Sequence, residues 1–283
     1  MTIEGHGTVM MGESGKVVGR ATRPAKARIF ASLARAGMRL LPWAIGIVLW
    51  ELVAQTHLVR PGLVPTPLAV LENFWDRLLY NHLWLDIYMS CMRVFLGLTF
   101  GITAAIPVAF ILGWYRSARR LVDPLINFFR SLPPIALIPL VIVYFGIGEL
   151  AKVVLLFYAS FFSGVIVMYE GILQTNPLYI RVARTFGATD REIFWRVIMP
   201  LSVPHVLTAL RVALGISWAT VVAAELIAAR HGLGAVIENA ANYFQLTTIY
   251  MGIICIGLVA LVMDSCLRLI SHRVVRWQDR IAP

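Results

Sequence analysis

Charged residues are scarce in this sequence. Asp, Glu, Lys and Arg make up 14% of its 283 residues, whereas an ordinary soluble domain has about 25%. Hydrophobic residues make up 59%, and the mean hydropathy is +0.77. One soluble core cannot cover so much apolar surface, because core volume limits burial. The composition therefore excludes an ordinary soluble domain and favours a protein that faces a lipid bilayer.

Catalytic and metal-binding patterns are also missing. The sequence has no Walker A motif, no His-Glu-x-x-His and no Gly-x-Ser-x-Gly, and its nearest Walker-like string, Gly12–Val17, lacks the spacing and the final Ser or Thr. The three cysteines form no CxxC and no metal-like spacing. We therefore predict no catalytic residue, no metal site and no cofactor in this chain. If ATP hydrolysis drives its activity, another subunit must carry it.

Long stretches without charge mark the expected membrane spans. A helix needs about 20 mostly apolar residues to cross the hydrocarbon, and four charge-free stretches approach that length. Two further apolar segments carry isolated charges, at Glu51 and at Arg211 and Glu225. The sequence predicts an all-α polytopic membrane protein with a cytoplasmic tail (1–37) and one transmembrane domain (38–280). The six expected spans are about 38–56, 88–115, 124–146, 150–170, 203–229 and 246–268.

Two of these spans carry sequence features that predict how they pack. Gly97 and Gly101 form a small-xxx-small pair, which permits close contact between helices. Pro133, Pro134 and Pro139 interrupt the third span. Proline breaks a helical hydrogen-bond ladder, and lipid tolerates this only where protein or a cavity satisfies the freed carbonyls. We therefore expect the third span to be broken and to face the protein interior.

The basic residues predict the topology. Lys and Arg cluster before the first span and in the segments after the second, fourth and sixth spans, while the other links are poor in cations. Cationic segments stay in the cytoplasm, so both termini are expected there. The isoelectric point of about 10.0 also suggests nucleic-acid binding. The alternating distribution of the cations favours the topology interpretation, so the predicted partner is the lipid bilayer and not nucleic acid.

The cytoplasmic segment 174–200 is too regularly patterned to be a plain linker. Asn176 and Pro177 form a helix start, and Gly187 provides a left-handed stop. Thr189 and Glu192 then form a capping box that begins a second helix, expected over 191–199 and ending at Pro200. Some apolar side chains of this rigid, protruding element are expected to contact another protein.

This segment resembles the EAA loop of bacterial ABC-importer permeases. The resemblance rests on Arg181-Val182-Ala183-Arg184-Thr185-Phe186-Gly187-Ala188, followed by Ile198-Met199-Pro200. Arg181 stands where the family has Glu and Val182 where it has the first Ala, whereas Gly187 and Pro200 are kept. In that family the loop contains the coupling helix, which docks into a groove of the ATPase subunit. The departure at Arg181 leaves the contact made by the family's Glu without a counterpart.

Motifs from about residue 63 to 277 extend the likeness to the nitrate, sulfonate and taurine permeases. They include Ser90-x-x-Arg93, Arg130-Ser131-Leu132-Pro133-Pro134 and Ala224-Glu225-Leu226-Ile227 through Gly232-Leu233-Gly234. The residues of these motifs are most similar to those of the taurine branch. The resemblance implies a type I importer fold and a homodimer in the bacterial inner membrane. It also implies two ATPase subunits that hold ATP and Mg, and a periplasmic or lipid-anchored substrate-binding protein.

The expected substrate is a small anion, first taurine or another alkanesulfonate, with nitrate, bicarbonate or an aromatic acid as alternatives. An ion-gradient-driven secondary transporter would need coupled acidic residues in mid-membrane. Glu51, Glu225 and Asp264 instead lie near span ends. A membrane-embedded enzyme would need a catalytic constellation, which the sequence lacks.

Charged residues at membrane depth are costly and need a reason. Arg93 either reaches the surface or contacts an anion. Arg211 either reaches the cytoplasmic surface or pairs with a carboxylate or helix end, and Glu225 either caps a gate or pairs across a dimer. Together with polar residues near the proline cluster and in the fifth span, the candidate pathway residues are Arg93, Arg130, Ser131, Arg211, Ser217, Trp218 and Glu225.

Overall fold

The structure is a computed structural model that describes residues 41–56 and 62–275, and within them it contains helices and no strand. The chain divides into two compact units, Met1–Leu52 and Val53–Pro283. The part of the first unit that is described belongs to one apolar helix, Leu41–Gln55, which corresponds to the first expected span. The predicted tail 1–37 lies outside the described residues.

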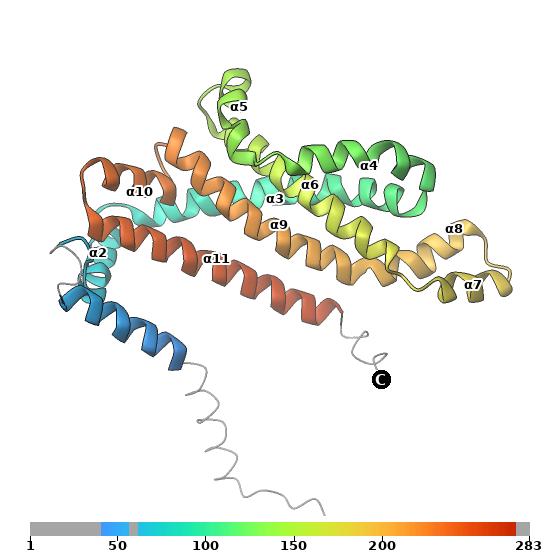
Figure 1. The fold of residues 1–283 in the computed structure, drawn as a ribbon, viewed down its shortest axis with the longest axis horizontal. Helices are drawn as coiled ribbons and strands as arrows, with labels where there is room; N and C mark the ends of the chain where they lie inside the picture. Colours follow the sequence, from blue (N-terminus) through green and yellow to red (C-terminus); the bar gives the residue numbers. More distant parts are fainter. Residues whose placement is uncertain (1–40, 57–61, 276–283) are drawn as a thin grey trace, which may run out of the picture. The chain divides into compact units, whose positions relative to one another are not determined.

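Four helices of the second unit are long and apolar enough to cross a membrane. They are α3 (Leu83–Trp114), α6 (Glu149–Leu173), the continuous helix Asp190–Ile227 that contains most of α9 (Met199–Ala228), and α11 (Leu246–Val274). Figure 1 shows α3, α6 and α9 side by side, with α11 against α9. The predicted all-α membrane fold is confirmed, and α3 begins five residues before the expected start at 88.

Close packing of α3 on α6 depends on two glycines. A Cβ on Gly97 would overlap the side chain of Leu156, and one on Gly101 would overlap the hydroxyl of Ser160. The Ser160 hydroxyl also donates to the carbonyl of Gly97 at 2.9 Å. The sequence prediction of a close helix contact at this pair is therefore confirmed.

The third expected span consists of two helices and not one. α4 (Arg116–Ser131) ends before Pro133, and a 3-10 turn (Pro134–Leu137) then leads into α5 (Ile138–Phe145). The segment Pro134–Phe145 is bent by 84° relative to α4. If this bent pair crosses the membrane as one span, the described residues contain up to five spans. The broken ladder was predicted. In this single copy α5 packs on α6 and α9 through Ile138 while Val143 and Tyr144 are exposed, so the inward-facing position stays a prediction.

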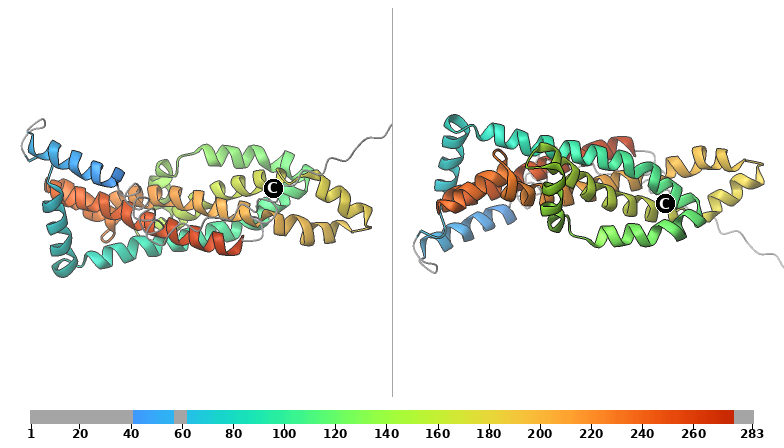
Figure 2. Two further views of the ribbon diagram at one scale, coloured as in Figure 1. Left: turned by 90° about the horizontal axis from the view of Figure 1, so that it is seen from below. Right: turned by 90° about the horizontal axis from the view of Figure 1, so that it is seen from above.

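The two ends of the second unit differ in what they carry. α2 (Pro67–Tyr80) and α10 (Leu233–Asn242) lie at one end, and α7 (Pro177–Thr185) and α8 (Asp190–Ile193) protrude at the other (Figure 2). α2 begins with Thr66 as N-cap, whose hydroxyl accepts the amide of Ala69 at 3.3 Å. Prolines at 61, 65 and 67 precede or begin this helix. α2 lies across the ends of the long helices (Figure 2).

The sequence had predicted that the second helix of the loop ends at Pro200, but the helix continues through this residue. A π-helical turn over Phe194–Ile198 connects α8 to α9, and the amide of Met199 bonds to the carbonyl of Phe194. Proline lacks an amide donor and its ring clashes with the carbonyl four residues earlier. The wider π turn just before Pro200 accommodates both defects, so the helix continues through the proline.

Candidate functional site

The protruding loop has the local structure that its sequence predicts. Asn176 caps α7 by accepting the amide of Leu178 at 2.9 Å. Gly187 has φ +78, a left-handed conformation that favours glycine, and the amide of Ala188 bonds back to the carbonyl of Ala183 at 3.1 Å. A Cβ on Gly187 would meet no atom within 4 Å. Conformation, and not space, is therefore what requires glycine at this elbow.

The second half of the loop is locked by the predicted capping box. The hydroxyl of Thr189 accepts the amide of Glu192 at 3.3 Å, and the Glu192 carboxylate accepts the amide of Thr189 at 3.0 Å. Arg184 and Asp190 add an exposed ion pair at 3.1 Å across the elbow. The capping box fixes the first turn of α8, and the ion pair links α8 to α7. We infer from these contacts that the loop is a stiff element and not a flexible link.

The apolar side chains of the loop separate into two groups. Ile193 is buried and packs with Phe110 of α3, Ile172 of α6 and Ile198. Phe186 is 86% exposed, and it borders a hollow of about 330 Å³ that is also lined by Arg196 and Val197. The buried group anchors the loop on the long helices. The exposed group forms a surface that this chain leaves uncovered.

At the opposite end of the unit, Arg93 of α3 is 1% exposed and surrounded by acceptors. Its Nε and Nη2 donate to the two carboxylate oxygens of Glu149, at the start of α6. Its Nη1 donates to Glu225 of α9 at 2.6 Å and to the backbone carbonyl of His231 at 2.7 Å. One guanidinium therefore joins α3, α6, α9 and the link that follows α9. We call Asp86, Ser90, Arg93, Glu149, Lys152 and Glu225 the Arg93 cluster.

Glu225 holds the chain that follows α9. Its carboxylate accepts the hydroxyl of Ser90 at 2.8 Å and the amide of Gly234 at 2.9 Å. The Ser90 hydroxyl in turn accepts the amide of Leu233, and Asp86 accepts the amide of Gly232, both at 2.9 Å. Three consecutive amides of the link are thus bound by side chains, and a buried carboxylate with this many partners is held in one place.

The cluster also explains two glycines. Gly232 has φ +132, and a Cβ there would lie 2.5 Å from the Glu225 carboxyl carbon and 2.7 Å from Nη1 of Arg93. A Cβ on Gly234 would lie 2.6 Å from the Cβ of Glu225. The backbone of the link can reach the charged groups only because both positions lack a side chain.

One interpretation of the charged residues was wrong. Arg93 does not reach the surface, because its guanidinium is buried between Glu149 and Glu225. Glu225 pairs with Arg93 within its own chain. For Arg211 the structure selects one of the alternatives, since its Nε lies 3.0 Å from the Asp264 carboxylate of α11. The sequence gives the depth of each charged residue within its own span, but it does not show which other helices lie against that residue.

The seven predicted pathway residues do not form one site in the described chain. Arg93 and Glu225 meet, whereas Arg211 lies with Asp264 and Arg268. Arg130 and Ser131 are exposed at the end of α4, where the Ser131 hydroxyl donates to the carbonyl of Asn127. Ser217 and Trp218 are buried in α9, and the Ser217 hydroxyl and the Trp218 indole nitrogen have no hydrogen-bond partner among residues 41–56 and 62–275.

Sequence reasoning gave no role to Asp86, Ser90, Glu149 and Lys152. Asp86, Ser90 and Arg93 follow a spacing of four and three, which places them on one helix face. Glu149 and Lys152 form an ion pair at 3.0 Å in the first turn of α6, directly after Gly148. The spacing could have marked a polar face on α3, but nothing local could have assigned its partners.

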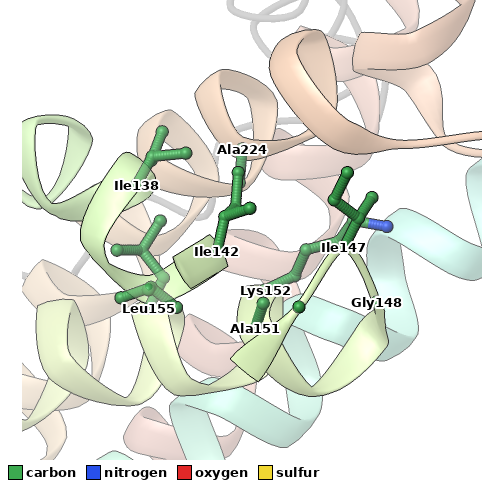
Figure 3. Close-up of a pocket in the computed structure, with 10 residues that line it drawn as sticks. Ile138, Ile142, Ile147, Gly148, Ala151, Lys152, Leu155 and Ala224 are labelled. Carbon is green, nitrogen blue, oxygen red and sulfur yellow. The ribbon is translucent and has the colours of Figure 1, made fainter. Parts of the chain in front are cut away.

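A small cleft beside this cluster is too narrow for a substrate. Figure 3 shows it between Ile138 and Ile142 of α5, Ala151 and Lys152 of α6 and Ala224 of α9. Its free volume is about 10 Å³, roughly what a single water needs. We interpret it as a packing gap where α5 meets α6 and α9.

Comparison with known proteins decides the family. The sequence model of the binding-protein-dependent transport system inner membrane component matches residues 97–276, which include α6, the protruding loop and α9. The chain belongs to this family. The resemblance predicted from the loop motif is thereby confirmed, and the chain is a permease of the ABC-importer type related to taurine, sulfonate and nitrate permeases.

Individual relatives cover most of this permease. A probable ABC transporter permease protein of Brucella abortus (strain 2308) is 45% identical over 88% of this chain and 99% of its own. The taurine transport system permease protein TauC of Escherichia coli (strain K12) is 33% identical over 84% of this chain and 88% of its own. In fold, this permease resembles the MetNI methionine ABC transporter in an inward-facing conformation. That match has a TM-score of 0.61 and 20% identity, and it covers 68% of this chain and 97% of the solved one.

Proposed function

We propose that this permease carries a small anion, taurine or another alkanesulfonate, which a periplasmic or lipid-anchored binding protein delivers. Two copies of the chain form the pathway, and two ATPase subunits hold ATP and Mg and drive the cycle. Both termini and the loop 174–200 face the cytoplasm. The observation that supports this substrate is the similarity over most of the chain to a permease named for taurine transport.

The loop supports the proposed coupling. Its capped helices and the Gly187 elbow make it stiff, and Phe186 projects from it without a contact that would cover it. A stiff element transmits displacement, and an exposed aromatic ring is suited to fill a groove on a partner. In this proposal residues 181–188 dock on the ATPase, and the π turn before Pro200 passes the motion directly into α9.

The exposed face of α5 supports the homodimer. Val143 and Tyr144 are more than 70% exposed in this copy, although α5 packs on α6 and α9 through the buried Ile138. Proline-broken backbone in a membrane requires nearby protein or a cavity. A second copy placed against α5 would supply it, which also brings the two α9 helices and their unpaired Ser217 and Trp218 groups towards a shared pathway.

The proposed function is tested by uptake of labelled taurine into proteoliposomes that contain the permease, its ATPase and its binding protein. Uptake should require ATP and the binding protein, and unlabelled ethanesulfonate should compete. ATP-driven uptake of nitrate, bicarbonate or an aromatic acid without taurine uptake would replace the substrate and keep the mechanism. Uptake driven by an ion gradient without ATP would overturn the importer proposal.

The orientation is tested by reporter fusions. Fusions at Arg119 and Asp190 should report the cytoplasm, and fusions at Thr66 and His231 the opposite side. A non-cytoplasmic signal at Asp190 would remove the coupling role of the loop, because the ATPase could not reach it.

A further inference from the structure

A second polar feature adjoins the Arg93 cluster and has no part in the proposed coupling. It is a cavity of about 310 Å³ at the end of the unit that carries α2 and α10. Its walls come from α2, the start of α3, the link after α9, α10 and the turn that follows α10. The polar lining includes Arg77, Asp86, Arg230, His231, Asn239 and Gln245.

Positive charge in this cavity exceeds the negative charge that faces it. Asp86 is its carboxylate, and that group already accepts the Gly232 amide and lies 3.6 Å from Nδ1 of His231. Within the described part of the chain, the Arg77 side chain makes one hydrogen bond, from Nη2 to Gln245 at 3.1 Å. Arg230 has no hydrogen bond or ion pair with any residue in 41–56 or 62–275. Two guanidinium groups therefore keep free donors beside a single, occupied carboxylate.

The link that carries Arg230 is already ordered. The carbonyl of His231 is held by Arg93 at 2.7 Å, and the next two amides are held by Asp86 and Ser90. A ligand that binds here does not have to order this backbone first, and preorganisation of this kind improves affinity. The Arg93 cluster thus acts as the support of the cavity wall.

We propose that this cavity is an anion site, which takes a small sulfonate or carboxylate between the guanidinium groups of Arg77 and Arg230. Guanidinium donors match the planar edges of oxyanions, and the volume is at the lower end of the range for small-ligand pockets. The proposal rests on the proposed function, in which it serves as an entry site for the anion before it passes between the long helices. Donors from several elements surround a concave space, which favours a small anion over an acidic protein segment.

The site can be tested without transport. Asn239, which lines the cavity, is replaced by cysteine in the full chain in lipid nanodiscs. Its rate of reaction is compared for two methanethiosulfonate reagents, one carrying a sulfonate and one a trimethylammonium group. Asn242→Cys, which is exposed on the same helix outside the cavity lining, is the matched control, and the parent chain reports reaction at its own cysteines.

At Asn239→Cys the ratio of sulfonate to ammonium rates should exceed that of the control about tenfold, because focused positive potential concentrates anions. Adding Arg230→Gln should remove most of this excess without a folding cost, since Arg230 holds no other group. Arg116→Gln, at an exposed arginine elsewhere, should not. Ethanesulfonate should slow the reaction at millimolar concentration, and its neutral analogue ethyl methyl sulfone should not.

Equal ratios at both cysteines, or an excess that survives Arg230→Gln, would overturn the anion site. Protection by a binding protein but not by ethanesulfonate would also overturn it and would make the cavity a docking contact. The cysteine reaction rate reports only on the cavity, so a failure of this anion site can be distinguished from a failure of the proposed function. Intact taurine uptake without anion preference rejects this site alone, whereas anion preference without ATP-driven sulfonate uptake rejects the proposed substrate alone.

Discussion

The two ends of this permease differ in what they bury and what they expose. At one end, the Arg93 cluster buries the charged groups of Arg93, Lys152 and Glu225. Arg93 and Glu225 each have several hydrogen-bond partners, and the half-exposed Glu149 pairs with Arg93. At the other end, the loop 174–200 satisfies its backbone locally and exposes an aromatic ring. Buried charge is tolerable only when it is paired and hydrogen-bonded. Exposed apolar surface is tolerable when a partner covers it.

This contrast agrees with the proposed function, in which the chain itself holds the first end and the ATPase covers the second. A substitution in the Arg93 cluster should therefore reduce stability and activity together. A substitution at the tip of the loop should reduce activity while the fold persists.

Arg93→Gln should have the largest effect. It leaves Glu149 and Glu225 without their shared cation, and removing one partner of a buried pair typically costs about 3–5 kcal/mol. The thermal midpoint of the detergent-solubilised protein should fall strongly, and uptake should be lost. Arg120→Gln, at an exposed arginine outside the cluster and the candidate pathway, is the control and should change neither. An unchanged midpoint for Arg93→Gln would show that the cluster does not hold the helices together.

Phe186→Asp should abolish uptake and substrate-stimulated ATP hydrolysis but leave the thermal midpoint within experimental scatter. The ring is 86% exposed in the isolated chain, so the carboxylate harms only a contact with a partner, where it would be buried without a counter-charge. Ser117→Asp adds the same charge to the exposed turn before α4 and should be harmless. Wild-type uptake by Phe186→Asp would reduce the loop to a linker.

Gly232→Ala should have an intermediate effect on stability. The new Cβ overlaps the Glu225 carboxyl group, and φ +132 is strained for any residue with a side chain. Strained backbone of this kind costs of order 1–3 kcal/mol, so the midpoint should fall less than for Arg93→Gln. Gly257→Ala in α11, where a Cβ meets nothing within 4 Å, is the matched control. An unchanged midpoint for Gly232→Ala would mean that the cluster is less tightly packed around Gly232 than in this structure.

Thr189→Ala should have the smallest effect. It removes one N-cap hydrogen bond to the amide of Glu192, worth about 1 kcal/mol of local helix stability. Uptake should fall slightly, and amide hydrogen exchange should rise in residues 189–193 and not in α3. Thr208→Ala removes a hydroxyl that bonds within a helix interior and should have no such local effect. Loss of transport as complete as that of Phe186→Asp would mean that loop stiffness, and not the docking contact, limits coupling.

The accuracy of sequence prediction followed the range of the interactions. The cap at Asn176, the left-handed Gly187 and the capping box at Thr189 depend on residues within four positions of one another, and all three were correct. The predicted helix end at Pro200 was wrong because a five-residue π turn before the proline lets the helix continue. No residue type in the sequence indicates such a turn. The partners of Arg93 were missed because Glu149 and Glu225 lie 56 and 132 positions away.

The sequence by itself determined the class of protein, the long apolar helices, the small-residue contact at Gly97 and Gly101, and the local form of the loop 174–200. These follow from composition, periodicity and local hydrogen bonding, which a chain carries wherever it folds. Only the tertiary structure decided that Arg93, Glu149 and Glu225 form one buried cluster, that Arg211 pairs with Asp264, and that Arg77 and Arg230 share a cavity. Such charge pairs depend on which helices lie side by side, and the choice of neighbours is made by packing across the whole bundle.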